Sequence, residues 1–335
     1  MTNNIDVDIA PGPWSGRTDG LGSEHLRWHQ AVTPYRPGAG PGTVLIGFAS
    51  DEGVRRNKGR QGAAAGPDAL RKALSSMALE KETALSDAGT VAVTGDRLEE
   101  GQDALGRAVT TALDSGRLAV VLGGGHEVAY GTYLGVAGSA LRQQHPRLGI
   151  LNLDAHFDLR SDPIPSSGTP FRQIAEAEEA AGTSHRYDVI GISQPSNTNV
   201  LFDTAHRLGA RYLLDDHCGV ADRARVDEFL TDFLGDVDIV YLTIDLDVLP
   251  AGVAPGVSAP AAYGVPLEII QHVCDRVSAS GKLAVVDVAE LNPCLDVDNR
   301  TARTAARLIH RIVTGTFRRQ PETGLSPLSR SSPPL

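Results

Sequence analysis

The stretch Leu151-Asn-Leu-Asp-Ala-His-Phe-Asp-Leu-Arg160 decides the fold, because it places polar side chains at the end of an apolar strand. The residues Leu148–Leu153 form a short apolar run that is typical of a fully buried strand. Asp154, His156 and Asp158 follow at alternate positions, and alternate side chains of an extended chain point to one face. Because burying two unpaired carboxylates would be costly, the pattern favours a cation site over a solvated strand end.

Apolar runs alternate with helix-like segments along the chain. The clearest expected strands are Thr43–Phe48, Leu118–Leu122, Leu148–Leu153, Asp188–Ile192, Val237–Leu249 and Lys282–Val288. Helices are expected at residues 99–115, 128–144, 267–280 and 300–317. This alternation predicts an α/β fold of three layers, α/β/α, in which a mostly parallel central sheet is covered by helices on both faces. Ligands of such sheets bind beyond the carboxyl ends of the strands.

The domain organisation follows from shifts in composition along the 335 residues. Residues 1–40 are rich in Gly, Pro and polar groups, which predicts an N-terminal arm or loop. Residues 41–318 carry all the expected strands and helices, and we expect them to form a single catalytic domain. Residues 319–335 are rich in Pro and Ser, which predicts a disordered tail.

Composition excludes several classes of protein. The net charge of −10 argues against nucleic acid as a partner, which would need a basic surface. No apolar run reaches the length of a membrane span, and the N-terminus lacks the basic and apolar regions of a secretory signal. The three cysteines show no C-x-x-C spacing, which favours free thiols in a reducing compartment. We therefore expect a cytoplasmic protein without a membrane partner.

Two other expected strands also end in polar side chains. His126 follows the strand Leu118–Leu122 and a run of three glycines, and Asp245 and Asp247 close the strand Val237–Leu249. The six candidate ligands are therefore His126, Asp154, His156, Asp158, Asp245 and Asp247. Six ligands are too many for one catalytic zinc, and this oxygen-rich set suits two divalent ions such as manganese. A pair of ions can lower the pKa of a shared water and polarise a neighbouring carbon.

A long polar loop at residues 51–66 carries several cations: Arg55, Arg56, Lys58 and Arg60. It is either a solvated basic loop or a lid that binds an anion, since loops beyond strand ends often carry binding sites. A second loop with the character of a binding site covers residues 161–170 and contains Ser167.

These motifs resemble those of the ureohydrolase superfamily, which includes arginase and agmatinase. The shared motifs are Gly124-Gly125-His126-Glu127, Asp154-Ala-His156-Phe-Asp158 and Asp245-Leu-Asp247, and the resemblance covers residues 44–312. Within the superfamily the chain is most similar to the formimidoylglutamase branch. That similarity rests on Asp51-Glu-Gly-Val-Arg-Arg-Asn-Lys-Gly-Arg60, Ser166-Ser-Gly-Thr-Pro-Phe-Arg172, and Val248-Leu-Pro250 with Ala254-Pro-Gly-Val-Ser-Ala-Pro260.

The resemblance implies an arginase-like fold, a homo-oligomer and two manganese ions per chain held by the six ligands named above. It also implies that Glu290 grips the planar cation of the substrate. Phe171 stands where arginase has a proton-shuttling His, so Asp158 becomes the candidate proton donor to the leaving amine. Arg160 stands where arginase has an Asn, which adds positive charge where the far end of a substrate would lie.

The implied reaction is the hydrolysis of a small molecule, N-formimidoyl-L-glutamate, to glutamate and formamide in histidine degradation. Arg160 and Arg172 are the first candidates to bind its dianionic tail, because Arg binds carboxylates with a planar fork. The weaker candidates for this pocket are Arg56, Lys58, Arg60 and Ser167. The alternatives are a guanidine hydrolase similar to agmatinase or guanidinobutyrase, and a metal-binding relative without catalytic activity.

Overall fold

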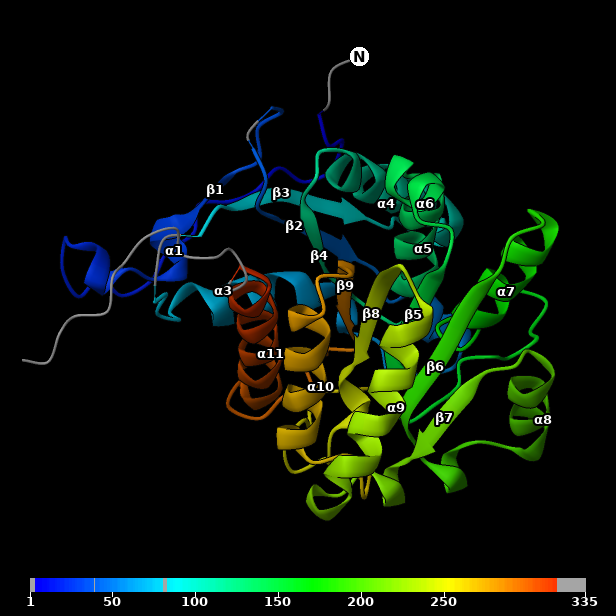
Figure 1. Cartoon of the computed structure of the whole chain (residues 1–335). Coiled ribbons are helices and arrows are strands. Elements are labelled where there is room, and N and C mark those ends of the chain that lie inside the picture. The colour runs from blue at the N-terminus through cyan, green and yellow to red at the C-terminus, as the bar shows by residue number, and fades with distance from the viewer. Residues whose placement is uncertain (1–3, 39, 81–82, 318–335) are drawn as a thin grey trace, which may run out of the picture.

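The computed structural model describes residues 4–38, 40–80 and 83–317, so the predicted tail at 319–335 lies outside the described residues. Within these ranges the strands form a nine-stranded sheet in the order β1-β3-β2-β4-β9-β8-β5-β6-β7, and all neighbours pair in parallel (Figure 1). The strands are β1 Val32–Pro34, β2 Thr43–Ala49, β3 Leu85–Ala92, β4 Leu118–Leu122, β5 Leu148–Leu153, β6 His185–Ile192, β7 Arg211–Leu214, β8 Ile239–Asp245 and β9 Leu283–Ala289.

Helices cover both faces of the sheet, which confirms the predicted three-layer α/β/α architecture (Figure 1). The helices are α1 Trp28–Ala31, α2 Glu52–Arg56, α3 Gly66–Ser75, α4 Leu98–Asp114, α5 Val128–Gly138, α6 Ala140–Gln144, α7 Pro170–Ala180, α8 Asn199–Arg207, α9 Arg223–Asp236, α10 Leu267–Ala279 and α11 Arg300–Phe317. One core joins α3, α9, α10 and α11 to the sheet, and a second core joins α4, α5, α7 and α8 to the opposite face. Among the described residues, no helix is both long and apolar enough to cross a lipid bilayer.

The central strands are apolar along their whole length because both of their faces are buried. In β8, Leu242 and Ile244 enter one core and Ile239 and Tyr241 enter the other. A strand that is covered on both sides seldom holds charged side chains away from its ends, and Asp287 of β9 is an exception among the central strands. Charged groups therefore gather where the central strands β4, β9, β8 and β5 finish.

Local structure differs from the expected elements in three places. Residues 128–144 form two helices, because Ser139 adopts an extended backbone and its hydroxyl accepts the N–H of Arg142 at the start of α6. The loop at 51–66 contains the short helix α2 and a 3₁₀ turn, Ala63–Ala65. The arm at 1–40 contributes α1 and the edge strand β1, which pairs with β3.

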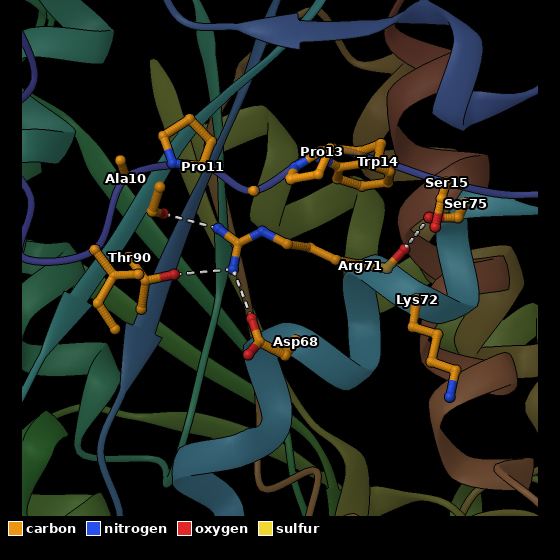
Figure 2. Close-up of a pocket in the computed structure, with 13 residues that line it drawn as sticks. Ala10, Pro11, Pro13, Trp14, Ser15, Asp68, Arg71, Lys72, Ser75 and Thr90 are labelled. Atoms are coloured by element: carbon orange, nitrogen blue, oxygen red, sulfur yellow. Dashed lines mark hydrogen bonds and ion pairs between the residues drawn. The ribbon is translucent and has the colours of Figure 1, made fainter.

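Buried aromatic and ionic contacts hold the N-terminal arm against the domain. The indole N–H of Trp14 donates to Asp87 at 2.9 Å, and Arg71 donates to both oxygens of the same carboxylate at 2.9 and 3.0 Å. Trp14 and Arg71 border a cavity of about 360 Å³ between the arm, α3 and β3 (Figure 2). Trp28 is fully buried, stacks on Trp14 and donates from its indole N–H to His310 at 3.0 Å.

Trp28→Ala is expected to lower the free energy of unfolding by about 3–5 kcal/mol, because it removes a fully buried aromatic side chain and leaves a cavity. Chemical denaturation of both proteins measures the difference. The control Leu21→Ala removes an apolar side chain that is fully exposed, and it should change the stability by less than about 0.5 kcal/mol. Equal stability of Trp28→Ala and wild type would show that the arm does not belong to the folded core.

Candidate metal centre

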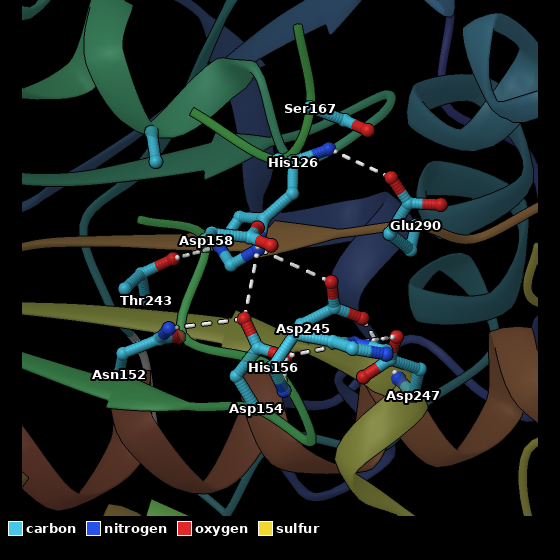
Figure 3. A network of polar contacts seen from close by, with 12 residues as sticks. His126, Asn152, Asp154, His156, Asp158, Ser167, Thr243, Asp245, Asp247 and Glu290 are labelled. Atoms are coloured by element: carbon cyan, nitrogen blue, oxygen red, sulfur yellow. Dashed lines mark hydrogen bonds and ion pairs between the residues drawn. The ribbon is translucent and has the colours of Figure 1, made fainter. Parts of the chain in front are cut away.

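The predicted ligands lie together at the carboxyl ends of the central strands (Figure 3). His126 follows β4, and Asp154, His156 and Asp158 follow β5. Asp245 is the last residue of β8. The adjacent positions of these strands in the sheet therefore bring together side chains that are up to 121 residues apart in the chain, from 126 to 247.

One group of ligands surrounds His126. Its Nδ1 atom lies 3.2 Å from an oxygen of Asp154, 3.0 Å from Asp158 and 3.1 Å from Asp245. Nδ1 is buried, and none of the three oxygens meets it in hydrogen-bonding geometry. One imidazole nitrogen and three carboxylate oxygens thus point at a common volume, which is the arrangement expected around a divalent cation.

A second group contains Asp154, His156 and Asp247. Nδ1 of His156 lies 3.1 Å from an oxygen of Asp247 and 3.5 Å from an oxygen of Asp154. Asp154 belongs to both groups and uses a different oxygen in each, Oδ2 toward His126 and Oδ1 toward His156. Its two oxygens therefore face different imidazoles.

The ligands converge by a route that differs from the extended chain expected from alternate spacing. β5 ends at Leu153, and Asp158 lies in a loop with a positive φ of 48°. Asp247 belongs to a 3₁₀ turn, Leu246–Val248, and its backbone N–H donates to Asp245 at 2.8 Å. The expectation that both motifs are extended was wrong, because tight turns after the strand ends fold the side chains inward.

The charges of these side chains fit a cation. Four carboxylates face two imidazoles, so even two protonated rings would leave the cluster negative. Burial opposes the charged form of His126, but three facing carboxylates outweigh it and hold the pKa of His126 well above its ordinary value. Burial, then the charges of Asp247 and Asp154, raise the pKa of Asp245 well above its usual range. Buried carboxylates that repel one another need added positive charge to ionise together.

Glu290 lies at the edge of the cluster, directly after β9. It has a positive φ of 69°, and its Oε1 accepts the backbone N–H of His126 at 2.8 Å. Burial, and then the charge of Glu127, raise the pKa of Glu290 to about 8. Glu290 thus offers a carboxylate beside the ligands whose ionisation a bound cation would favour.

A cavity of about 450 Å³ opens onto the cluster. Its lining combines predicted ligands and Glu290 with cations and a polar group: His126, His156, Asp158, Asp245, Asp247, Glu290, Lys58, Arg60, Arg160 and Ser167. Asp154 is completely buried beneath it. Of the residues predicted for metal and substrate binding, the cavity lining therefore lacks Asp154, Arg172 and Arg56.

The predicted tail-binding cations have different surroundings. Among the described residues, no ion-pair partner faces the side chain of Arg160 or of Lys58. Arg60 also lines the cavity, but its guanidinium donates to the carbonyl oxygens of Ser258 at 3.0 Å and Val257 at 2.9 Å. All three keep their charge, but Arg60 uses two of its N–H groups on carbonyl oxygens, whereas the side-chain donors of Arg160 and Lys58 have no partner among the described residues and are free for a ligand.

Arg172 and Arg56 do not line the cavity, so the structure gives no support to their prediction as substrate-binding residues. Arg172 is on α7 and donates to Glu176, one helical turn later, at 2.8 Å. Arg56 donates to Glu52 at 2.9 Å and to Glu99 at 2.6 Å. Each guanidinium group is therefore already paired with nearby carboxylates, Arg172 with Glu176, and Arg56 with Glu52 and Glu99.

Three polar residues of the site were not predicted. Thr243 Oγ1 lies 2.9 Å from Nε2 of His126, and Asn152 donates to Asp154 at 3.0 Å. Both precede a predicted ligand by two residues on a strand, so the two-residue period could have found them. Asn57 donates to the hydroxyl of Ser167 at 3.1 Å and joins the two loops, a contact without any signal in the sequence.

Comparison with known proteins agrees with this geometry. Residues 42–315 match the model of the arginase family. The formimidoylglutamase of Rhodococcus jostii is 72% identical over 91% of this chain and 96% of the relative, and that of Ralstonia nicotianae is 52% identical over 93% and 97%.

Solved structures share the fold. The formimidoylglutamase of Bacillus subtilis has a TM-score of 0.77 at 20% identity, covering 90% of this chain and 93% of that one. A Trypanosoma cruzi formiminoglutamase solved with Mn²⁺ has a TM-score of 0.71 at 28% identity, covering 82% and 93%. The family match over most of the chain, the close relatives and the shared fold lead to one conclusion: the chain belongs to the arginase family.

Proposed function

We propose that this chain hydrolyses N-formimidoyl-L-glutamate to L-glutamate and formamide, a step of histidine degradation. The observation that carries the proposal is the polarity of one cavity, whose lining combines a cluster of carboxylates with cations that have no ion-pair partner among the described residues. This polarity matches a substrate with a cationic amidine at one end and two carboxylates at the other. The relatives named formimidoylglutamase support the same reaction. A cytoplasmic location and a homo-oligomeric state belong to the same proposal.

The cluster fits two manganese ions. His126, Asp154, Asp158 and Asp245 would hold one, and Asp154, His156 and Asp247 would hold the other. When bound, the two ions supply an activated water at neutral pH and stabilise the negative charge that develops during its addition. The oxygen-rich ligand set is the reason to assign manganese, and structures of formiminoglutamase from Trypanosoma cruzi contain Mn²⁺.

The side chains around the ions then orient the substrate and handle its protons. The carboxylate of Glu290 pairs with the planar amidine cation and holds the reacting carbon over the cluster. Asp158 also lines the cavity, and we assign one of its carboxylate oxygens to return a proton to the α-nitrogen of glutamate as the C–N bond breaks. Water adds to the amidine carbon, so the products are formamide and free glutamate, and the atoms balance.

The opposite wall takes the two carboxylates of the substrate. Arg160 is the first candidate, because its guanidinium is unpaired among the described residues and can bind a carboxylate through two hydrogen bonds. Lys58 adds a second charge, and the hydroxyl of Ser167 can donate a hydrogen bond. Arg60 contributes its charge to the wall while its hydrogen bonds hold the loop at Ser258.

The first test of this proposal is metal content. Elemental analysis of the purified, manganese-loaded protein should find about two ions per chain. Asp154→Ala should lose both, because Asp154 belongs to both groups of ligands, whereas Asp247→Ala should lose only the ion of the His156 group. Wild-type protein that is fully active with a single ion per chain would contradict the two-ion site.

The second test is the role of Arg160. Arg160→Ala should lower kcat/KM for formimidoylglutamate by about 10- to 100-fold, the effect of losing a hydrogen bond to a charged group worth roughly 1.5–3 kcal/mol. Arg172→Ala is a matched control, because it removes the same charge from a helix surface outside the cavity. It should change kcat/KM by less than about threefold, the scale of a surface substitution.

Substrate choice is the third test and separates the tail pocket from the metal site. Agmatine carries no anion for Arg160, so its kcat/KM should be far below that of formimidoylglutamate. Arg160→Ala should not lower kcat/KM for agmatine, because no bond is lost and a repulsion with its terminal ammonium group is removed. If wild-type protein prefers agmatine, the metal site stands and the proposed reaction is wrong.

A further inference from the structure

A buried polar group lies behind the metal centre, on the side away from the cavity. Thr243 of β8 and Asp287 of β9 are paired across the two strands and are both completely buried. Tyr241 lies two residues before Thr243 and therefore on the same face of β8. Burying a carboxylate in such a position costs free energy unless hydrogen bonds or opposite charges compensate it.

The two oxygens of the Asp287 carboxylate have different surroundings. The phenol of Tyr241 donates to Oδ2 and lies 3.3 Å from the carbonyl oxygen of Ala129. The other oxygen, Oδ1, is buried and has no hydrogen-bond partner among the described residues. Asp287 is thus a buried carboxylate that is paired with Thr243 across the two strands and whose Oδ1 can accept a hydrogen bond.

The link to the metal centre is the contact between Thr243 and His126. Oγ1 of Thr243 lies 2.9 Å from Nε2 of His126, while Nδ1 of the same ring faces the three carboxylates (Figure 3). A threonine hydroxyl has one proton to donate. If the hydroxyl of Thr243 donates that proton to Asp287, its oxygen can only accept a hydrogen bond from the ring of His126. Nε2 of His126 must then carry a proton. The other nitrogen, Nδ1, is then the one that can bind a cation.

We propose that Thr243 and Asp287 are positioning residues that keep a proton on Nε2 of His126 and so direct Nδ1 to the ion held with Asp154, Asp158 and Asp245. This inference rests on the two-ion site proposed above. Groups that bind the second nitrogen of a metal-ligating histidine in this way fix its tautomer and orientation.

The contact from Thr243 orients His126 only, so it affects the ion of the His126 group and not that of the His156 group. His156, the imidazole of the second group, is partly exposed to the cavity. Among the described residues its ring has contacts through Nδ1, to Asp154 and Asp247, and none through Nε2. Loss of the Thr243 hydroxyl should therefore lower the affinity for the ion of the His126 group and leave the affinity for the ion of the His156 group unchanged.

Mn²⁺ binding isotherms test the proposal without using turnover. The electron paramagnetic resonance signal of free Mn²⁺ reports how many ions bind and how tightly. Thr243→Val keeps the shape of the side chain and removes its hydroxyl, so it should raise the Kd of one of the two ions by about 10- to 100-fold. Thr243→Ser keeps the hydroxyl and should bind both ions as wild type does.

A second pair of variants separates positioning from packing. Asp287→Asn can donate to Thr243 and no longer fixes the direction of its hydroxyl, so it should weaken the same ion. Tyr241→Phe removes another hydrogen bond of Asp287 but leaves the contact between Thr243 and His126 intact. It should keep both ions even where its thermal stability falls as much as that of Asp287→Asn.

The proposal is overturned if Thr243→Val binds both ions with wild-type affinity, or if Tyr241→Phe and Asp287→Asn lose the ion equally. The second pair alone decides the question if Thr243→Val does not fold. A wild-type isotherm with fewer than two ions is a different result, because it removes the two-ion site itself and with it the proposed function.

Discussion

The repulsion among four buried carboxylates is the constraint on which the centre of this structure depends. The strands β4, β9, β8 and β5 are buried on both faces, so most of their charged residues lie at or beyond the ends. Asp154, Asp245 and Asp247 meet there within a few ångströms, almost without access to water. Such a cluster is stable only with bound protons or cations, which ties the folding of this edge of the sheet to metal binding.

The backbone around the ligands is packed as closely as the side chains. A Cβ atom on Gly124 would lie 1.9 Å from the carbonyl oxygen of Ser50, so only glycine allows β4 to turn there and deliver His126. Glu127, the next residue, accepts the hydroxyl of Ser50 at 2.7 Å and the N–H of Gly53 at 2.9 Å. One short segment thus supplies a ligand and also fixes the loop that forms the cavity wall.

The sequence predicted the features that depend on a local pattern of residues. It missed those that depend on the direction in which a side chain points. The ligands could be found because they follow apolar strands, and parallel strands bring their carboxyl ends to one edge. Arg172 could not be placed correctly, since its distance from the cavity depends on how α7 begins at Pro170. The inward turn at Asp158 needs a positive φ, which non-glycine residues seldom adopt and the spacing does not reveal. Thr243 had a visible signal, its position on the face of Asp245.

The division of the cavity explains how related enzymes can share a metal centre and differ in substrate. The ligands and Glu290 lie at or just beyond the ends of the central strands, whereas Arg160 lies further along a loop, where residues can change without disturbing the core. The loop nevertheless holds Arg160 in place. Its N–H donates to the carbonyl oxygen of Gly168 at 2.9 Å, and a Cβ on Gly168 would come 2.7 Å from its Cδ. Gly168 thus lets the stem of Arg160 pack closely against the loop. Because this packing already restricts the stem, less entropy is lost when the guanidinium of Arg160 binds an anion.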